Sequence, residues 1–115
     1  MIIYILLIKE VIITGSGEVL CYETITGRYF NSSVETIRQA QNTLNAEMLN
    51  EMYVSLNDLF REIGLPVTGY GEEVGWTVDK QLDIQFSTVL SDDGRPAVAI
   101  GYNYTPIKGY SSLQR

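Results

Sequence analysis

The stretch SSVETIRQAQNTLNAEMLN, residues 32–50, decides the fold because it holds the strongest helical signal in the chain. Its apolar side chains recur every three or four residues, which places them on one face of a helix: Val34, Ile37, Leu44 and Met48, with Ala40 and Leu49 widening the stripe. Gln41 is the one polar residue that breaks this stripe. Ser32 and Glu35 have the spacing of a capping box, so the pattern predicts a helix over 33–50.

A second helix is expected directly after the first. Ser55 is a candidate N-cap, and Asp58 stands in the first turn, where a carboxylate complements the helix dipole. Gly64 is placed to stop the helix, and Pro66 prevents its continuation. The predicted helix therefore spans residues 56–63.

The segment 65–76 is rich in glycine and proline, which predicts a structured loop or a very short helical turn. It ends at Trp76, the single tryptophan of the chain. We interpret this tryptophan as a lid on the core rather than a platform for a ligand. Together with Gly64, Gly71 and Gly75, it forms a set of residues that we assign to the fold and not to chemistry.

The C-terminal part has the period of two residues that is typical of strands, over about 81–90 and 96–104. Between these arms lies Ser-Asp-Asp-Gly-Arg, in which Gly94 suits the left-handed position of a bulged turn. The pattern predicts a hairpin in an antiparallel sheet. The residues after it, 106–115, are expected to form a loose tail.

The N-terminus begins with an apolar run over residues 2–8, which is far shorter than the roughly 20 residues of a membrane-spanning helix. Its isoleucines favour a strand, and 2–13 could pair with 18–24 as a further hairpin. A wrongly assigned start of the chain and an edge used for assembly are the alternatives. The whole chain, residues 1–115, is then one α+β domain: two helices on an antiparallel sheet to which N-terminal strands are added.

Composition excludes several classes of function. The chain of 115 residues has no histidine, one cysteine and a net charge of −6. Without histidine the commonest general base and metal ligand is absent, and one cysteine allows no cysteine cage for a metal. We therefore expect a non-enzymatic protein with no metal and no cofactor. Its acidity and scattered basic residues also predict no nucleic-acid partner, and the short apolar run at the N-terminus predicts no membrane partner.

The sequence contains only weak local motifs for metal binding or catalysis. Asp79 and Asp83 flank a predicted bend, and Asp92-Asp93-Gly94 lacks the spacing of a calcium loop. Cys21 lies in an apolar strand, where a thiol acts as a small hydrophobe. The clearest candidate for an interaction surface is the group of tyrosines near the C-terminus, Tyr102, Tyr104 and Tyr110, because tyrosine combines a large contact area with a polar tip.

Several motifs occur in an order that resembles a known group of proteins: Thr26 to Phe30, Ser55 to Phe60, Ile63 to Pro66, Gly75-Trp76, and Asp92 to Pro96. The chain resembles short, uncharacterised proteins encoded by phages and integrative mobile elements of Gram-positive Firmicutes. This resemblance covers about residues 22–107 and leaves residues 1–21 outside it. It implies no activity, because no function is assigned to that group.

The expected function is that of a small accessory or modulator protein that binds another protein. The alternative, from a different class, is a structural subunit of a virion head or tail that assembles with copies of itself. The expected location is the cytoplasm of the bacterial host cell, or the virion in the second case. The partner is unidentified in both readings.

Overall fold

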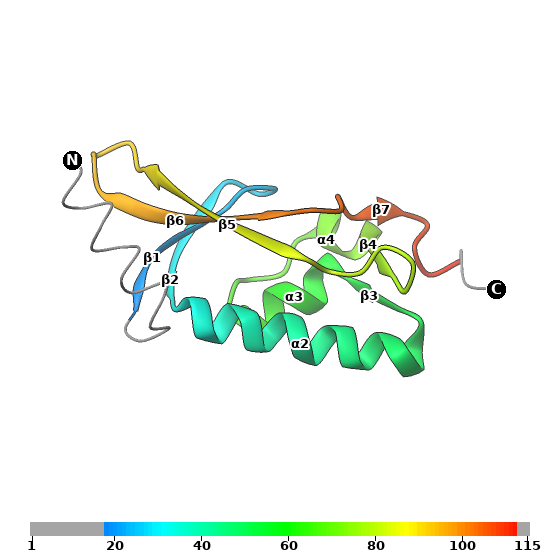
Figure 1. Ribbon diagram of the computed structural model, residues 1–115. Helices are drawn as coiled ribbons and strands as arrows, with labels where there is room; N and C mark the ends of the chain where they lie inside the picture. Colours follow the sequence, from blue (N-terminus) through cyan, green and yellow to red (C-terminus); the bar gives the residue numbers. More distant parts are fainter. Residues whose placement is uncertain (1–17, 113–115) are drawn as a thin grey trace. The chain divides into compact units, whose positions relative to one another are not determined.

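The structure is a computed structural model that describes residues 18–112 (Figure 1). The strand predicted for residues 2–13 lies outside the described residues. Contacts within the chain divide the described residues into two units, one formed by 18–37 with 84–101 and the other by 38–83 with 102–112. Both helices and strands are present, which confirms the α+β class that the sequence predicts.

The first unit is built on a four-stranded sheet. In their order across the sheet, its strands are β2 (Arg28–Ser32), β1 (Val19–Glu23), β6 (Pro96–Tyr102) and β5 (Ile84–Leu90). β5 and β6 are neighbours, as the hairpin prediction requires, but both are shorter than the predicted 81–90 and 96–104. The connection between them closes with a hydrogen bond from Ser91 N to Arg95 O (2.8 Å), and Gly94 is left-handed there, with φ of 81°.

The sheet is mixed rather than antiparallel, which corrects the sequence-based expectation. β1 pairs antiparallel with β2 but parallel with β6, with Tyr22 opposite Ala99. Thr24 extends this parallel junction, since its backbone N–H and its hydroxyl both donate to Ile100 O (3.3 and 2.9 Å). A parallel pair needs a long crossover connection, and β1 and β6 have most of the chain between them.

The turn between β1 and β2 is organised by a buried carboxylate. Glu23 is fully buried and accepts hydrogen bonds from the backbone N–H groups of Ile25 (3.0 Å) and Thr26 (2.7 Å), and from the Thr26 hydroxyl (2.7 Å). Gly27 completes the turn with φ of 67° and donates to Glu23 O (2.9 Å). Buried charge is tolerated only when it is well hydrogen-bonded, and this acid meets that condition.

Helix α2 (Val34–Glu51) lies where the sequence predicts it, but Ser32 is not its cap. Ser32 is the last residue of β2 and is buried. The hydroxyl of Ser33 accepts instead from Thr36 N (3.1 Å) and donates to Thr36 Oγ1 (2.9 Å). The predicted capping box of Ser32 with Glu35 is therefore wrong by one residue, because strand pairing holds Ser32 in the sheet.

Replacing Ser33 by alanine should lower the free energy of unfolding by about 1 kcal/mol, since the change leaves an N–H of the first helical turn without its acceptor. Urea denaturation followed by circular dichroism measures this change. Ser33→Thr is the matched control, because threonine keeps the capping oxygen. Equal stability of Ser33→Ala and Ser33→Thr would show that the hydroxyl does not support the helix.

The second unit combines helices with a three-stranded sheet (Figure 1). Besides most of α2, it contains β3 (Tyr53–Ser55), α3 (Leu56–Ile63), α4 (Gly69–Glu73), β4 (Val74–Thr77) and β7 (Ile107–Lys108). α3 has the predicted bounds and has a complete capping box between Ser55 and Asp58. The buried side chains of this unit include Leu44 and Met48 of α2 and Phe60 of α3.

This second sheet was not expected from the sequence. β4 is its central strand and pairs antiparallel with β3 on one side and with β7 on the other. β7 lies within the segment predicted as a loose tail, so that prediction is wrong for this segment. Val74 pairs with Lys108 and Gly75 with Ile107, and Tyr110 donates to Glu72 O (3.0 Å).

Candidate functional site

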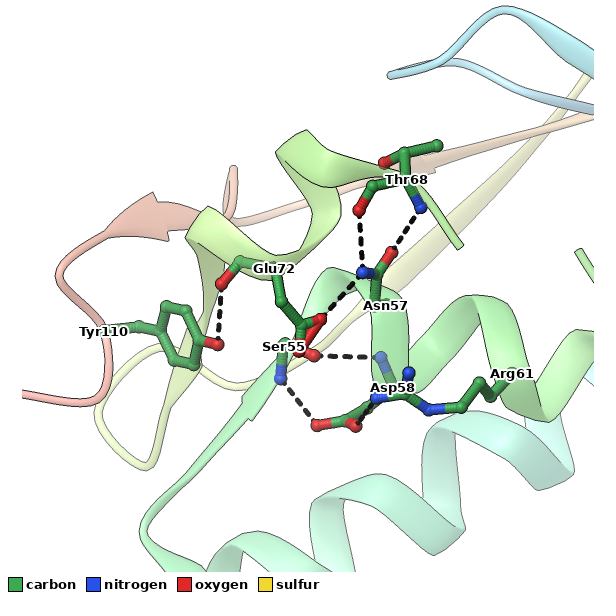
Figure 2. A network of polar contacts seen from close by, with 7 residues as sticks. All are labelled: Ser55, Asn57, Asp58, Arg61, Thr68, Glu72 and Tyr110. Atoms are coloured by element: carbon green, nitrogen blue, oxygen red, sulfur yellow. Dashed lines mark hydrogen bonds and ion pairs between the residues drawn. The ribbon is translucent and has the colours of Figure 1, made fainter. Parts of the chain in front are cut away.

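Polar residues of α3, α4 and the segments beside them form the network that Figure 2 shows. At its centre is Asn57, which is 2% exposed. Its amide Nδ2 donates to Thr68 O (2.8 Å) and to Glu72 Oε2 (2.8 Å), and its Oδ1 accepts from Thr68 N (3.0 Å). This side chain therefore joins α3 to the loop before α4 and to α4 itself.

The start of α3 extends this network on one side. Ser55 Oγ accepts from Asp58 N (3.0 Å), and Asp58 Oδ2 accepts from Ser55 N (2.8 Å). Arg61 donates to Asp58 Oδ1 at 2.7 Å on an exposed surface, and this hydrogen bond raises the pKa of the arginine. These polar groups satisfy one another, so the network builds the fold and leaves no obvious reactive group.

The glycines that the sequence analysis assigns to the fold lie at tight positions. Gly64 ends α3 in the left-handed conformation, with φ of 84°. A Cβ on Gly71 would stand 2.0 Å from Asn57 Oδ1, and a Cβ on Gly75 would stand 2.1 Å from Val54 O. Only glycine lets the backbone come so close to the Asn57 side chain at Gly71 and to the backbone of β3 at Gly75.

Trp76 is buried, at 1% exposure, as the lid interpretation predicts. Its indole N–H donates to Tyr104 O (2.7 Å), and its ring packs on that of Tyr102, with the centroids 5.3 Å apart. An indole that is buried with its N–H satisfied is a structural element of the second unit.

The three C-terminal tyrosines do not share one surface. The ring of Tyr110 lies against Gly75 and contacts the ring of Tyr53, with the centroids 5.5 Å apart, whereas Tyr102 lies against Trp76. Successive residues of a strand face opposite sides of its sheet, so Tyr102 and Tyr110 lie against opposite faces of β4. Tyr104 is the most exposed of the three, at 40%.

Tyr104 instead lines a polar cavity of about 380 Å³ in the second unit, which we call the acidic cavity. Its other polar lining residues are Gln41, Asn45, Asp79, Gln81 and Asp83, and its apolar ones are Val78 and Leu82. The volume lies within the roughly 300–1,000 Å³ that is usual for ligand sites. This cavity is the candidate functional site.

The acidic cavity presents mainly hydrogen-bond acceptors. Asp79 and Asp83 contribute carboxyl groups, which in their ionised form accept hydrogen bonds and donate none. Asn45 donates from Nδ2 to Leu82 O (2.9 Å), while its Oδ1 is buried and has no hydrogen-bond partner within the described part of the chain. A buried acceptor without a donor is unfavourable, so this lining suits a ligand that brings N–H groups and positive charge.

Two signals of this cavity are present in the sequence, but they lie far apart in it. Gln41 is the residue that breaks the apolar stripe of α2, and the structure places it in the lining. Asp79 and Asp83, which flank the predicted bend, line the same cavity. Residues separated by almost 40 positions in the chain come together only through the tertiary fold.

Within residues 18–112, Cys21 and the acidic side chains lack the features of a nucleophile or a metal site. Burial raises the pKa of the Cys21 thiol to about 11, which opposes the thiolate form that a nucleophile needs. Among residues 18–112, no group of three or more Asp, Glu, Cys or His side chains is arranged to hold a metal ion. In the same part of the chain, no helix combines the length and the apolar character of a membrane span.

Comparison with known families shows to which family the chain belongs. The sequence matches a family described as a family of unknown function (DUF6353) over residues 7–111, and the chain belongs to this family. The match begins closer to the N-terminus than the motifs that carried the resemblance. No curated protein and no solved structure matches the chain.

Proposed function

We propose that this protein is a non-enzymatic binding module whose acidic cavity receives a basic side chain of a partner protein. The observation that carries this proposal is the lining of the cavity, in which the carboxylates of Asp79 and Asp83 stand with the buried, unsatisfied Oδ1 of Asn45. All of these groups accept hydrogen bonds. A guanidinium or ammonium group brings N–H donors and a positive charge that complement these carboxylates.

The charge of the whole chain supports the same partner. With a net charge of −6, the protein attracts cationic segments over a distance and repels phosphate backbones. We therefore propose a basic protein segment as the ligand, and neither a nucleic acid nor a membrane. No histidine is available for acid–base chemistry, which supports a role in binding rather than catalysis.

We further propose that the module comes from a phage or an integrative element and acts in the cytoplasm of the bacterial host. The order of motifs from Thr26 to Pro96 supports this origin. In the structure these motifs serve the fold, as the network around Asn57 illustrates. The proposed role is to bind a host or phage protein, and a site that receives a side chain of a partner agrees with that role.

The smallest probe of the acidic cavity is N-acetyl-arginine amide, titrated into the ¹⁵N-labelled protein and followed by NMR. Resonances of cavity residues such as Asn45, Asp79 and Tyr104 should shift, with a dissociation constant in the millimolar range that is usual for a single contact. Asp79→Asn combined with Asp83→Asn should weaken binding at least about tenfold, because hydrogen bonds to charged groups contribute roughly 1.5–3 kcal/mol each.

Asp92→Asn is the matched control for charge, because Asp92 is exposed in the connection between β5 and β6. This variant should bind the probe like the unmodified protein. N-acetyl-glutamate amide should cause no shifts in the cavity. If arginine amide shifts only residues outside the cavity, or if Asp92→Asn weakens binding as much as the double variant, the proposed site is wrong.

A virion subunit that assembles with itself is the second candidate, and one observation favours it. The second unit exposes several large apolar side chains, among them Leu49 (72%), Val67 (50%), Tyr70 (44%) and Ile107 (42%). Apolar surface of this kind is common at interfaces between subunits. Size-exclusion chromatography with light scattering at two concentrations separates the candidates, because a subunit of a ring or tube forms larger species at the higher concentration.

A further inference from the structure

A second, smaller cavity lies next to the acidic one in the same unit. It has a volume of about 230 Å³ and is lined by Gly75, Trp76, Thr77, Thr105 and Ile107, with Asp79 and Lys80 also in its lining. We call it the Trp76 slot. Asp79 lines both cavities, so they adjoin at this residue.

The slot exists because β7 is short. β7 pairs with Val74 and Gly75 only, while β4 continues to Trp76 and Thr77. Pro106 stands immediately before β7 and has no backbone N–H with which to continue the ladder. The last residues of β4 are buried and line the slot, and the exposed Ile107 forms part of its wall.

The lining suits an apolar side chain. The volume of the slot is below roughly 300 Å³, the lower end of the usual range for ligand sites. The slot therefore accommodates one side chain rather than a whole ligand. Lys80 and Asp79 stand together in this lining and offset each other's charge, so the slot attracts a cation less than the acidic cavity does. The basic group is thereby directed to the acidic cavity and the apolar group to the slot.

We propose that the partner of this protein presents a basic residue followed closely by a large apolar residue, the first held by Asp79 and Asp83 and the second in the Trp76 slot. This inference rests on the proposed function and adds the second half of the recognition motif. Charge complementarity selects the basic residue of the partner, and exclusion of water from the slot stabilises the bound apolar residue. The occupant is a segment of another protein.

Short capped peptides test the two halves separately. Ac-Arg-Leu-NH₂ and Ac-Arg-Gly-Leu-NH₂ cover two spacings and are compared with the same peptides carrying alanine in place of leucine. At least one leucine peptide should bind about tenfold more tightly than its alanine partner, which corresponds to burial of one apolar side chain. The Gly75 amide should shift only with the leucine peptides, whereas the Trp76 indole N–H, which donates to Tyr104 O, should respond to a ligand in either cavity.

Ile107→Thr should abolish the advantage of leucine without changing the affinity for the alanine peptides. Val67→Thr is the matched control, because Val67 is a similarly exposed β-branched residue of the same unit outside the slot. Lys80→Glu provides a second variant on the wall of the slot. Ac-Arg-Arg-NH₂ should bind to this variant more tightly than to the unmodified protein.

The outcomes separate the two proposals. If arginine amide binds in the acidic cavity but leucine adds no affinity, the slot inference is wrong and the proposed function stands. If the advantage of leucine persists in Ile107→Thr, or if Lys80→Glu does not favour Ac-Arg-Arg-NH₂, the second side chain binds elsewhere and the inference is also wrong. If no arginine-containing peptide shifts the cavity residues, both proposals fail.

Discussion

Replacing Trp76 by alanine is expected to lower the free energy of unfolding by about 3–5 kcal/mol, the range for removing a large aromatic ring from a core. The ring is 1% exposed and packs on Tyr102, and its indole N–H donates to Tyr104 O (2.7 Å). The change leaves a cavity and a carbonyl group without its donor. Since small domains have a total stability of roughly 5–15 kcal/mol, a large part of the chain should unfold at room temperature.

Thermal and urea denaturation followed by circular dichroism measure the effect. Trp76→Phe should lose less, because it retains an aromatic ring and removes the indole hydrogen bond. Tyr70→Ala removes an aromatic ring that is 44% exposed and should change stability little. A native emission maximum typical of an indole in water, together with a small effect of Trp76→Ala, would contradict the lid interpretation.

Gly75→Ala should be destabilising by about 3 kcal/mol, the upper end of the usual range for overpacking. The added Cβ would lie 2.1 Å from Val54 O and 2.9 Å from Ser55 Cα, both of which are backbone atoms of β3. A side chain can rotate away from such a clash, but a paired strand cannot. The separation of β3 and β4 must therefore increase, which weakens the sheet of the second unit.

Gly69→Ala is the matched control, because a Cβ at Gly69 meets no atom within 4 Å. This residue opens α4, where alanine also has a higher helix propensity than glycine, so stability should stay the same or rise. Gly71→Ala, against the side chain of Asn57, should fall between the two. Equal stability of all three variants would mean that β3 and β4 are not as close as the structure places them.

Local sequence patterns located the elements that depend on neighbouring residues. α3 has its predicted bounds because Ser55, Asp58 and Gly64 supply a cap, a countercharge and a stop within one short segment. The hairpin of β5 and β6 follows from alternation and from the left-handed Gly94. The start of α2 was wrong by one residue, since the two adjacent serines are equivalent until strand pairing retains Ser32 in β2.

The candidate site could be predicted only in fragments. Gln41 stood out as a polar residue in an apolar stripe, and Asp79 and Asp83 as carboxylates beside a bend. Neither observation shows that these residues line one cavity, because α2 and the segment after β4 are not adjacent in the chain. The predicted tyrosine surface shows the reverse case. Tyr102 and Tyr110 are close in sequence, but they lie against opposite faces of β4 and so do not share a surface.

The sequence by itself determined the class of the fold, the two longer helices and the C-terminal hairpin, because periodicity, caps and turn residues act over a few positions. The tertiary structure decided the parallel pairing of β1 with β6, the sheet of β3, β4 and β7, and the acidic cavity. These features depend on contacts between distant segments. A strand as short as β7, two residues long, has no period of its own, so it forms only where β4 offers a partner edge.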